Sequence, residues 1–224
     1  MKRVIIVGAR ADGHGKVVLE ILEAMRCFEV VGFVDDDPSK QNLVIRGLPV
    51  IGGMAELQEL KLKYALQGGI VAIADNPRRR YLGKRIQEAG LELVNAIHPT
   101  AHLDSDVSLG RGIVLCQGVI IVAGTSIGNS VNVHTGATID HDNIIEDGAN
   151  LGPGVHTAGR VRICRDAFVG TGSSMIPDVT VGEGAIVGAG AAVIRDVFAR
   201  VTAVGVPAKT IKSHQNIEVQ SDEK

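Results

Sequence analysis

Tryptophan is absent from this sequence of 224 residues, only 3% of the residues are aromatic, and the formal net charge is only −2. A chain with so little net charge has no electrostatic reason to bind nucleic acid or an anionic membrane as its main partner. No apolar run approaches the roughly 20 residues of a membrane-spanning helix, and the apolar segment after Lys2 and Arg3 is too short for a secretory signal. We therefore expect a cytoplasmic protein that binds small molecules, with no nucleic acid and no membrane insertion.

Cysteine is also scarce, and the three residues present, Cys27, Cys116 and Cys164, do not have the spacing of metal ligands. They are expected to be reduced structural thiols, and no metal is expected. Glycine is abundant at 28 residues, and 45% of the residues are hydrophobic. Much glycine with few aromatic residues is typical of a tightly wound β-solenoid, whose turns need glycine and whose narrow interior holds valine, isoleucine and alanine.

A repeat of six residues begins at Leu103 and continues for sixteen cycles. The first position of every cycle is apolar except at Thr157, and the largest polar side chain at the fifth position is Asn143. A period of six fits neither a helix nor regularly spaced hairpins, and it indicates the hexapeptide class of β-helix. The two departures from the pattern flank the stretch that carries His141.

The first third of the chain has the pattern of a nucleotide-binding βαβ unit. A β-branched run, 2–7, leads into a glycine-rich loop, 8–15, and then into an amphipathic helical pattern, and a second strand ends at Asp35 and Asp36. Glycines let the backbone approach phosphates at a helix N-terminus, and a carboxylate after the second strand can accept hydrogen bonds from a ribose or a base. The same residues also fit a simpler interpretation, a tight turn at Gly13 followed by an acidic turn.

A third strand, 70–74, is followed by a helix that begins at Asn76 and Pro77 and carries the basic run Arg78 to Arg80. Such a run is most often a solvated helix face. It nevertheless follows a strand end, the edge at which open parallel sheets bind ligands, so one arginine could meet a phosphate.

The pattern divides the chain into three parts. A last strand, 91–97, leads to a junction at His98 and Pro99. We predict an α/β Rossmann-like nucleotide-sugar-binding domain over residues 1–97, a β-helix domain over residues 98–211 and a polar tail over residues 212–224.

The repeat resembles the hexapeptide acyltransferases, which fold as a left-handed parallel β-helix. In that family three hexapeptides make one triangular coil, so residues 18 apart stack. Stacking places Ala123 and Gly159 one coil above and below His141, which leaves open space on both sides of its ring. Asp140 or Asp142 can accept a proton-bearing ring nitrogen of His141, and an imidazole oriented in this way can act as a general base.

Five motifs together make the chain similar to the PglD/NeuD family of bacterial sugar acetyltransferases. They are Gly13-His14-Gly15, Asp35-Asp36, Gly47 to Gly52, Thr135 to Asp142, and Gly205 to Lys209. The resemblance implies a homotrimer that moves an acetyl group from acetyl-CoA to an amino or hydroxyl group of a sugar. It also implies a role in the synthesis of a bacterial surface glycan.

The resemblance assigns roles to individual positions. His141 matches the general base, and Asp142 matches the acid that raises its basicity. Asn150 stands where well-known members carry a second histidine near the thioester. The remaining assignments are nucleotide-sugar contacts at Gly13, His14, Asp35, Asp36, Ala74 and Asn76, and acetyl-CoA contacts at Asn150, Gly159, Thr171, Gly188 and Ala189.

The favoured reaction is direct acetyl transfer to a UDP- or GDP-linked 4-amino-sugar bound between the two domains, without a covalent enzyme intermediate. One alternative is O-acetylation of a sialic acid by the same base. A second is a metal-dependent hydratase similar to the gamma carbonic anhydrases, suggested by His134, His141 and His156. A third is a catalytically inactive scaffold or sensor, which the intact pair of His141 and Asp142 disfavours.

Overall fold

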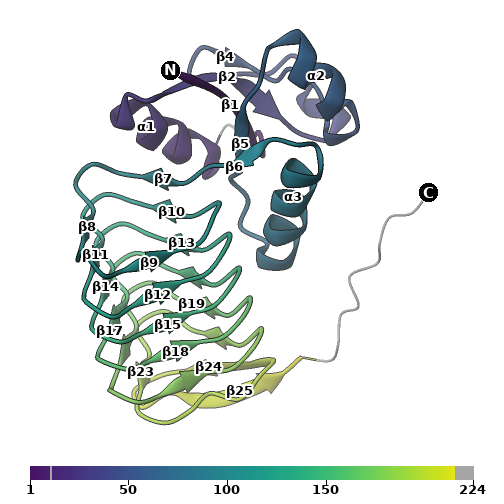
Figure 1. Ribbon diagram of the computed structural model, residues 1–224. Coiled ribbons are helices and arrows are strands. Elements are labelled where there is room, and N and C mark those ends of the chain that lie inside the picture. The colour runs from purple at the N-terminus through teal and green to yellow at the C-terminus, as the bar shows by residue number, and fades with distance from the viewer. Residues whose placement is uncertain (11, 215–224) are drawn as a thin grey trace.

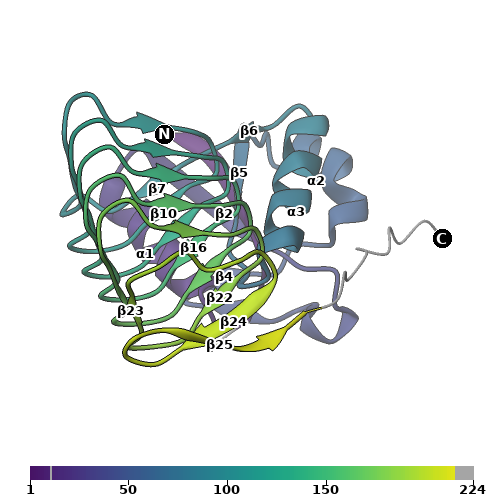
Figure 2. The same cartoon turned by 90° about the horizontal axis from the view of Figure 1, so that it is seen from below.

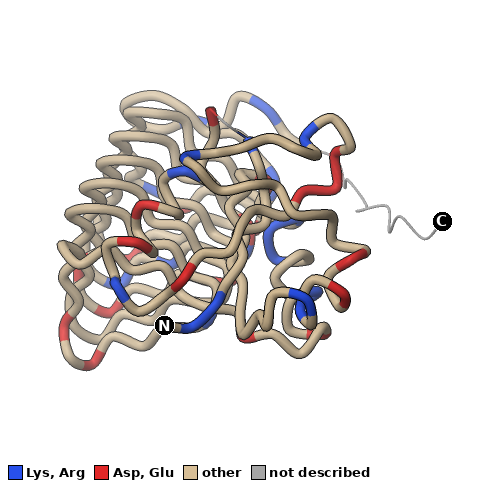
Figure 3. Tube along the Cα trace, turned by 90° about the horizontal axis from the view of Figure 1, so that it is seen from above, with Lys and Arg blue, Asp and Glu red and all other residues tan. Residues whose placement is uncertain are grey.

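The computed structural model describes residues 1–10 and 12–214. A small α/β part lies over one end of a long prism of stacked coils, and a single helix, α3 (Asn76–Glu88), runs beside the prism (Figure 1). The view along the prism shows its triangular cross-section, with α3 beside one edge (Figure 2). Acidic and basic residues are interspersed over the chain as it is seen in Figure 3, in keeping with the small net charge.

The α/β part is built on a four-stranded sheet of strand order β2-β1-β5-β6, in which all neighbouring strands are parallel. Alternate residues of β1 point to opposite faces. Val4 and Ile6 pack with helix α1, and Ile5 packs with helices α2 and α3. This confirms the Rossmann-like prediction. The elements are β1 (Lys2–Val7), α1 (Gly15–Met25), β2 (Phe28–Val34), β3 (Val44–Ile45), β4 (Leu48–Pro49), α2 (Leu57–Lys63), β5 (Gly68–Val71) and β6 (Glu92–Leu93), with 3-10 turns at Pro38–Lys40 and Met54–Glu56.

The rest of the described chain is a left-handed parallel β-helix with three sides. The first side contains β7 (Ala96–Ile97), β10 (Val114–Leu115), β13 (Asn132–Val133), β16 (Asn150–Leu151), β19 (Phe168–Val169), β22 (Ile186–Val187), β24 (Val201–Val204) and the antiparallel β25 (Lys209–Ser213). The second side contains β8 (His102–Leu103), β11 (Ile120–Ile121), β14 (Thr138–Ile139), β17 (His156–Thr157), β20 (Ser174–Met175) and β23 (Ala192–Val193). The third side contains β9 (Ser108–Leu109), β12 (Ser126–Ile127), β15 (Ile144–Ile145), β18 (Arg162–Ile163) and β21 (Thr180–Val181).

The strand pairs confirm the stacking period of 18 residues. Ile121 pairs with Ile139, and Ile139 pairs with Thr157. The first and fifth positions of each hexapeptide point inward and form one continuous core, mainly of valine, isoleucine and alanine. The period shortens only at the far end of the described prism, where Ile186 pairs with Thr202.

The α/β part covers the first side of the prism over its upper coils. Both residues of β10, β13 and β16 are buried, whereas the outward residue of β11 and of β15 is exposed. Val114 and Cys116 belong to the same buried cluster as Val18 and Leu19 of α1. The first side is therefore an internal surface in its upper half, and the other two sides face outward.

Arg79 fastens α3 to the edge between the third and first sides. Its side chain is fully buried, and it donates to the backbone carbonyl oxygens of Ser130 (2.9 Å), Gly148 (2.8 Å) and Ile73 (3.1 Å). Arg80 forms a two-pronged ion pair with Asp166 on the same edge. The interpretation of this run as a solvated face or a phosphate site is therefore wrong for Arg79 and Arg80.

Two further expectations change. The single strand predicted over residues 91–97 is two strands, because β6 joins the α/β sheet and β7 joins the prism. The polar tail predicted over residues 212–224 begins inside β25 (Lys209–Ser213), and residues 215–224 lie outside the described residues. Within the described ranges, no helix has both the length and the apolar character needed to cross a membrane.

Candidate active site

His141 lies at the edge between the second and third sides, in the corner that joins β14 to β15. Its ring nitrogen Nδ1 lies 2.8 Å from Oδ2 of Asp142, and its backbone N–H donates to Oδ1 of Asp140 at 2.8 Å. The two acids therefore have separate tasks, because Asp140 holds the backbone and Asp142 holds the ring. If Nδ1 donates to the carboxylate, Nε2 is left as a proton acceptor, and the side chain is 44% exposed, so a substrate can reach it.

Gly159 lies directly against the imidazole. A Cβ atom built on Gly159 would overlap Nε2 and Cε1 of His141. The stacking of these two residues is confirmed, but the open space expected on this side is filled by the ring itself. Any side chain at position 159 would cover the nitrogen that accepts the proton, so the absence of a side chain keeps that nitrogen accessible.

A ladder of charged residues follows the same edge. Asp142, Arg160 and Asp178 occupy equivalent positions of successive coils, all with positive φ, a conformation that Asp tolerates better than most residues. Arg160 donates to both carboxylate oxygens of Asp178, at 2.6 and 2.9 Å. The pKa of Arg160 is raised by this hydrogen bond and, to a smaller extent, by Asp142. Asp142 thus has a cation one coil away as well as His141 beside it.

The predicted nucleotide-sugar contacts lie together at the carboxyl ends of β1, β2 and β5, as the strand order requires. Asp35 uses both carboxylate oxygens within the protein, because it accepts from the N–H of Ala9 (2.7 Å), from Nζ of Lys40 (2.9 Å) and from the N–H of Asp37 (3.1 Å). Burial acts to raise the pKa of Asp35, but these hydrogen bonds outweigh it and the pKa is lowered. Asp35 therefore fixes the glycine-rich loop.

Asp36 keeps one oxygen available for a ligand. Its Oδ1 accepts from the N–H of Met54 at 2.7 Å, and its Oδ2 lies 4.0 Å from the exposed guanidinium of Arg78. The first turn of α1 has no side-chain cap at His14, so its N–H groups can meet an anion. A Cβ on Gly15 would lie 2.8 Å from the carbonyl oxygen of Gly8, so glycine is required where the helix passes the loop.

His14 and His134 form a pair of rings where the α/β part meets the first side. Their centroids are 4.9 Å apart, and Nε2 of His134 lies 3.1 Å from Oδ1 of Asn150. Burial, with smaller effects of His134 and Arg79, lowers the pKa of His14 to about 4. Burial also lowers the pKa of His134. Both rings are neutral at pH 7, so His14 does not offer a phosphate a positive charge.

Two of the predicted contact residues, Asn150 and Asn76, are buried and hydrogen-bonded in the junction between the α/β part and the prism. Asn150 is 3% exposed and its side chain bonds His134, so the single chain does not present it to acetyl-CoA. Asn76 is 7% exposed, and its Nδ2 donates to the carbonyl oxygen of Asp166 at 2.9 Å. Ala74 remains exposed after β5. The buried Asn side chains therefore hold the interface, a role that the family motif does not indicate.

The other predicted acetyl-CoA contacts lie at the edge between the first and second sides. Thr171 and Ala189 are exposed there, and Gly188 is half-buried. Ser173 is fully buried beneath them, and its hydroxyl lies 2.8 Å from the carbonyl oxygen of Gly170 and 2.9 Å from that of Gly188. The buried hydroxyl of Ser173 thus stabilises this corner from inside the prism by hydrogen bonds to the backbone.

Within one chain, Gly159 is the predicted acetyl-CoA contact that lies against His141. The glycine-rich loop lies at the α/β part, and Thr171, Gly188 and Ala189 lie at another edge of the prism. The edge that carries His141 is opposite the first side, and it is the first side that the α/β part covers. His141 and the glycine-rich loop of one chain therefore do not share a site, and the acceptor site expected between the two domains stays a prediction.

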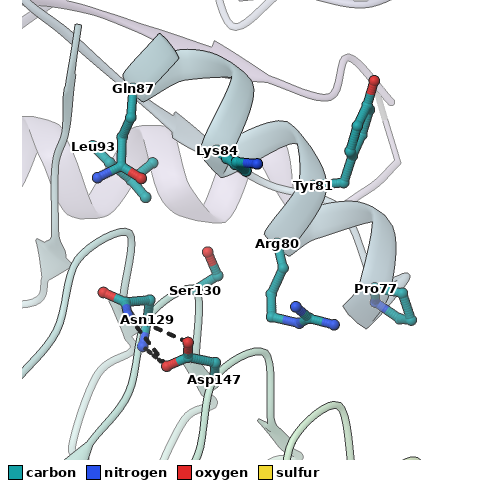
Figure 4. Close-up of a pocket in the computed structure, with 9 residues that line it drawn as sticks. All are labelled: Pro77, Arg80, Tyr81, Lys84, Gln87, Leu93, Asn129, Ser130 and Asp147. Carbon is teal, nitrogen blue, oxygen red and sulfur yellow. Dashed lines mark hydrogen bonds between the residues drawn. The ribbon is translucent and has the colours of Figure 1, made fainter. Parts of the chain in front are cut away.

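A cavity of about 450 Å³ lies elsewhere, between α3 and the edge of the third and first sides (Figure 4). Lys84 and Gln87 of α3 line it opposite Asn129 and Asp147, and Tyr81 also lines it, with its ring directed away from those two residues. It contains none of the predicted site residues. Within residues 1–10 and 12–214, no three His, Cys, Asp or Glu side chains lie close enough together to hold a metal ion.

The pH dependence of stability tests the His14 environment. Because the pKa of His14 is about 4 in the folded chain and about 6.5 when unfolded, the unfolded chain binds the extra proton first. The free energy of unfolding is expected to fall by up to about 3 kcal/mol as pH drops from 7 to 4, at about 1.4 kcal/mol per pKa unit. Denaturant unfolding of the wild type and of His14→Gln at several pH values measures this, and equal slopes for the two proteins would contradict it.

Comparisons with known proteins agree with this architecture. Residues 3–86 match the family model of the PglD N-terminal domain. PerB of Caulobacter crescentus, solved with CoA and GDP-perosamine, is 40% identical, with 95% of this chain and 98% of that chain covered and a TM-score of 0.88. The acetyltransferase domain of PglB from Neisseria gonorrhoeae, solved with acetyl coenzyme A, is 33% identical, with 94% and 99% covered and a TM-score of 0.86.

Among the curated proteins, the GDP-perosamine N-acetyltransferase of Escherichia coli O157:H7 is 30% identical over 158 residues, 68% of this chain and 72% of that protein. The chain also matches a serine acetyltransferase of Buchnera aphidicola, of which it spans 41% of the length. Two further structures of the Caulobacter crescentus perosamine N-acetyltransferase are of variants in which a histidine is replaced by asparagine or alanine.

Proposed function

This chain belongs to the PglD/NeuD-like family of hexapeptide-repeat sugar acetyltransferases, and we propose that it transfers acetyl from acetyl-CoA to the amino group of a nucleotide-linked amino-sugar. The observation that carries the proposal is the 2.8 Å contact of His141 with Asp142, with Nε2 left uncovered by Gly159. An oriented, accessible imidazole next to a carboxylate is what acyl transfer to an amine requires.

In the proposed reaction the amine nitrogen of the sugar attacks the thioester carbonyl carbon while Nε2 of His141 takes its proton. The resulting imidazolium is stabilised by the carboxylate of Asp142. When the tetrahedral intermediate collapses, the C–S bond breaks and the sulfur of CoA leaves with a proton. The products are the N-acetylated sugar and CoA, and the histidine returns to its neutral form.

A cysteine nucleophile is not needed and is poorly supported. Burial raises the pKa of Cys116 to about 11, and burial also raises the pKa of Cys164. Neither thiol is ionised to a useful extent at neutral pH, and the thiolate is the reactive form. Direct transfer is therefore the mechanism that the side chains support.

The acceptor is proposed to be a UDP- or GDP-linked 4-amino-sugar. The first turn of α1 offers N–H groups for the pyrophosphate, and Asp36 keeps one carboxylate oxygen for the nucleoside. A GDP-linked sugar has the added support that GDP-perosamine is bound in the related PerB structure. Sialic acid O-acetylation has no such support, because a free sialic acid has no use for the pyrophosphate site.

We further propose that the active unit is a homotrimer in the cytoplasm. Because the edge of His141 lies opposite the covered first side, each site would combine His141 of one chain with the glycine-rich loop of a neighbour. Acetyl-CoA would lie in the same groove between chains, between Gly159 of one chain and Thr171, Gly188 and Ala189 of the next. A closed cyclic arrangement makes three identical sites of this kind.

The test is an acetyl-transfer assay with purified protein, acetyl-CoA and a panel of acceptors, read by mass spectrometry of the acetylated product. UDP- and GDP-linked 4-amino-sugars are expected to be acetylated, and the corresponding 4-hydroxy sugars are the matched controls. Transfer to sialic acid in place of the amino-sugars would establish the O-acetyltransferase alternative. Hydration of carbon dioxide that depends on added zinc, without acetyl transfer, would establish the hydratase.

A further inference from the structure

Behind His141, the inward-pointing fifth positions of successive coils form a column inside the prism. In the described prism this column carries a polar side chain in only two coils. Along the edge between the second and third sides, the fifth positions of successive coils are Val107, Thr125, Asn143, Val161 and Val179. Thr125 is 1% exposed and Asn143 is 0% exposed, so both point into the core. The two polar levels are the coil of His141 and the coil directly above it.

Asn143 binds the backbone of the corner that carries His141. Its Nδ2 lies 2.7 Å from the carbonyl oxygen of Asp140, 3.1 Å from that of His141 and 2.9 Å from that of Ala158. Thr125 adds to this, because its hydroxyl donates to the carbonyl oxygen of Asp140 at 2.9 Å and accepts from the N–H of Asn143 at 3.2 Å. One buried amide therefore joins the His141 corner to Ala158, the residue before Gly159.

Packing does not explain an asparagine at this position. Its Oδ1 is buried without a hydrogen-bond partner in the described structure, and a buried polar atom in this state costs about 1–3 kcal/mol. Valine fills the same column at the coils below, Val161 and Val179, without that cost. What the asparagine provides and a valine would not is the set of hydrogen bonds to the corner that carries His141.

We propose that Asn143, assisted by Thr125, is a positioning residue for the general base, an inference that rests on the proposed function. The amide fixes the carbonyl groups on both sides of the His141 backbone, so the turn keeps the positive φ of 55° at Asp142. That turn sets the contact between Nδ1 and Asp142. The bond to Ala158 sets the distance between the ring and Gly159, and hence the direction of Nε2 toward the thioester.

The first test is Asn143→Val, which restores the apolar column and removes all three contacts to carbonyl oxygens. We expect kcat to fall about 10- to 100-fold, as for a misplacement of about 1 Å, while the KM for either substrate changes less than about threefold. The pH at which kcat is half-maximal should also move, because the His141 contact with Asp142 changes. Thr157→Val is the matched control, since Thr157 is 5% exposed, its hydroxyl has no partner in the described structure, and its loss should leave kcat unchanged.

A double-variant test separates positioning from general damage to the fold. In a His141→Ala background the base is absent, so Asn143→Val should not reduce the residual activity further. An equal fall of kcat in both backgrounds would overturn the proposal, as would an unchanged kcat in Asn143→Val. If His141→Ala itself kept full activity, the proposed function would fail instead, so the two failures are distinguishable.

Two milder variants decide the question if Asn143→Val does not fold. Thr125→Val keeps the shape and removes the hydrogen bond to the carbonyl oxygen of Asp140 and the one from the N–H of Asn143, and Asn143→Ser keeps one donor. Each is expected to lower kcat about three- to tenfold with a thermal midpoint close to that of the wild type, the size of effect expected for loss of one or two hydrogen bonds. Wild-type kcat and pH profile in both variants would overturn the proposal.

Discussion

Replacing His141 by alanine is expected to lower kcat for acetyl transfer by about 10²- to 10⁴-fold, the range that a positioned general base contributes. The side chain of His141 is 44% exposed and its ring packs against Gly159 at the surface of the prism, so its removal leaves no cavity in the core. The fold, the association of chains and the binding of the nucleotide-sugar should therefore be unchanged. Steady-state kinetics, with calorimetry for nucleotide-sugar binding, measures the two effects separately.

A matched control is available two coils above the site on the same side of the prism. His102 also pairs with an acid, since its Nε2 lies 3.1 Å from Oδ1 of Asp104, but it is far from Gly159. His102→Ala removes an exposed His–Asp pair without touching the proposed base and should keep wild-type kcat. Full activity in His141→Ala, or equal losses in both variants, would contradict the proposed mechanism.

The repeat and the neighbours of His141 could be predicted from the sequence because both follow from a fixed period. A spacing of 18 residues placed Gly159 against His141, and the structure has that contact. What the period cannot give is which side of the prism another part of the chain will cover. The family resemblance, for example, assigns Asn150 to acetyl-CoA, but the period does not indicate that its side chain is buried against His134 within the chain.

The role of Arg79 was also missed, although the sequence carried a signal for it. Arg79 lies three and seven residues before Leu82 and Ile86, so it shares the buried face of α3 with them. A positive charge on that face needs acceptors, and the corner carbonyl groups of the prism provide them. Composition alone suggests a solvated basic run, since it does not distinguish Arg79 from its exposed neighbour Arg78.

The split of the last predicted strand into β6 and β7 had no such signal in the sequence, because strands of two residues are defined by the strands with which they pair.

Arg79→Ala is expected to lower the free energy of unfolding by about 3 kcal/mol or more. The change leaves the carbonyl groups of Ser130, Gly148 and Ile73 without their donor and opens a hole in the junction between α3 and the prism. Burial lowers the pKa of Arg79 to about 10, so the side chain remains charged at pH 7 and its bonds are charge-assisted. Thermal and denaturant unfolding measure the loss.

The control for this variant is Arg78→Ala, one residue away on the exposed face of α3, which should change the free energy of unfolding by less than about 0.5 kcal/mol. Arg79→Lys should fall between the two, because an ammonium group cannot present the planar fork of donors that reaches Ser130 and Gly148 together. The same denaturation midpoint for Arg79→Ala and Arg78→Ala would contradict the proposal that Arg79 fastens α3 to the prism. In the proposed trimer the glycine-rich loop must be held toward a neighbour's His141, and Arg79 fastens α3, and with it the α/β part, to the prism. Arg79→Ala should therefore also lower acetyl transfer at temperatures below the unfolding transition.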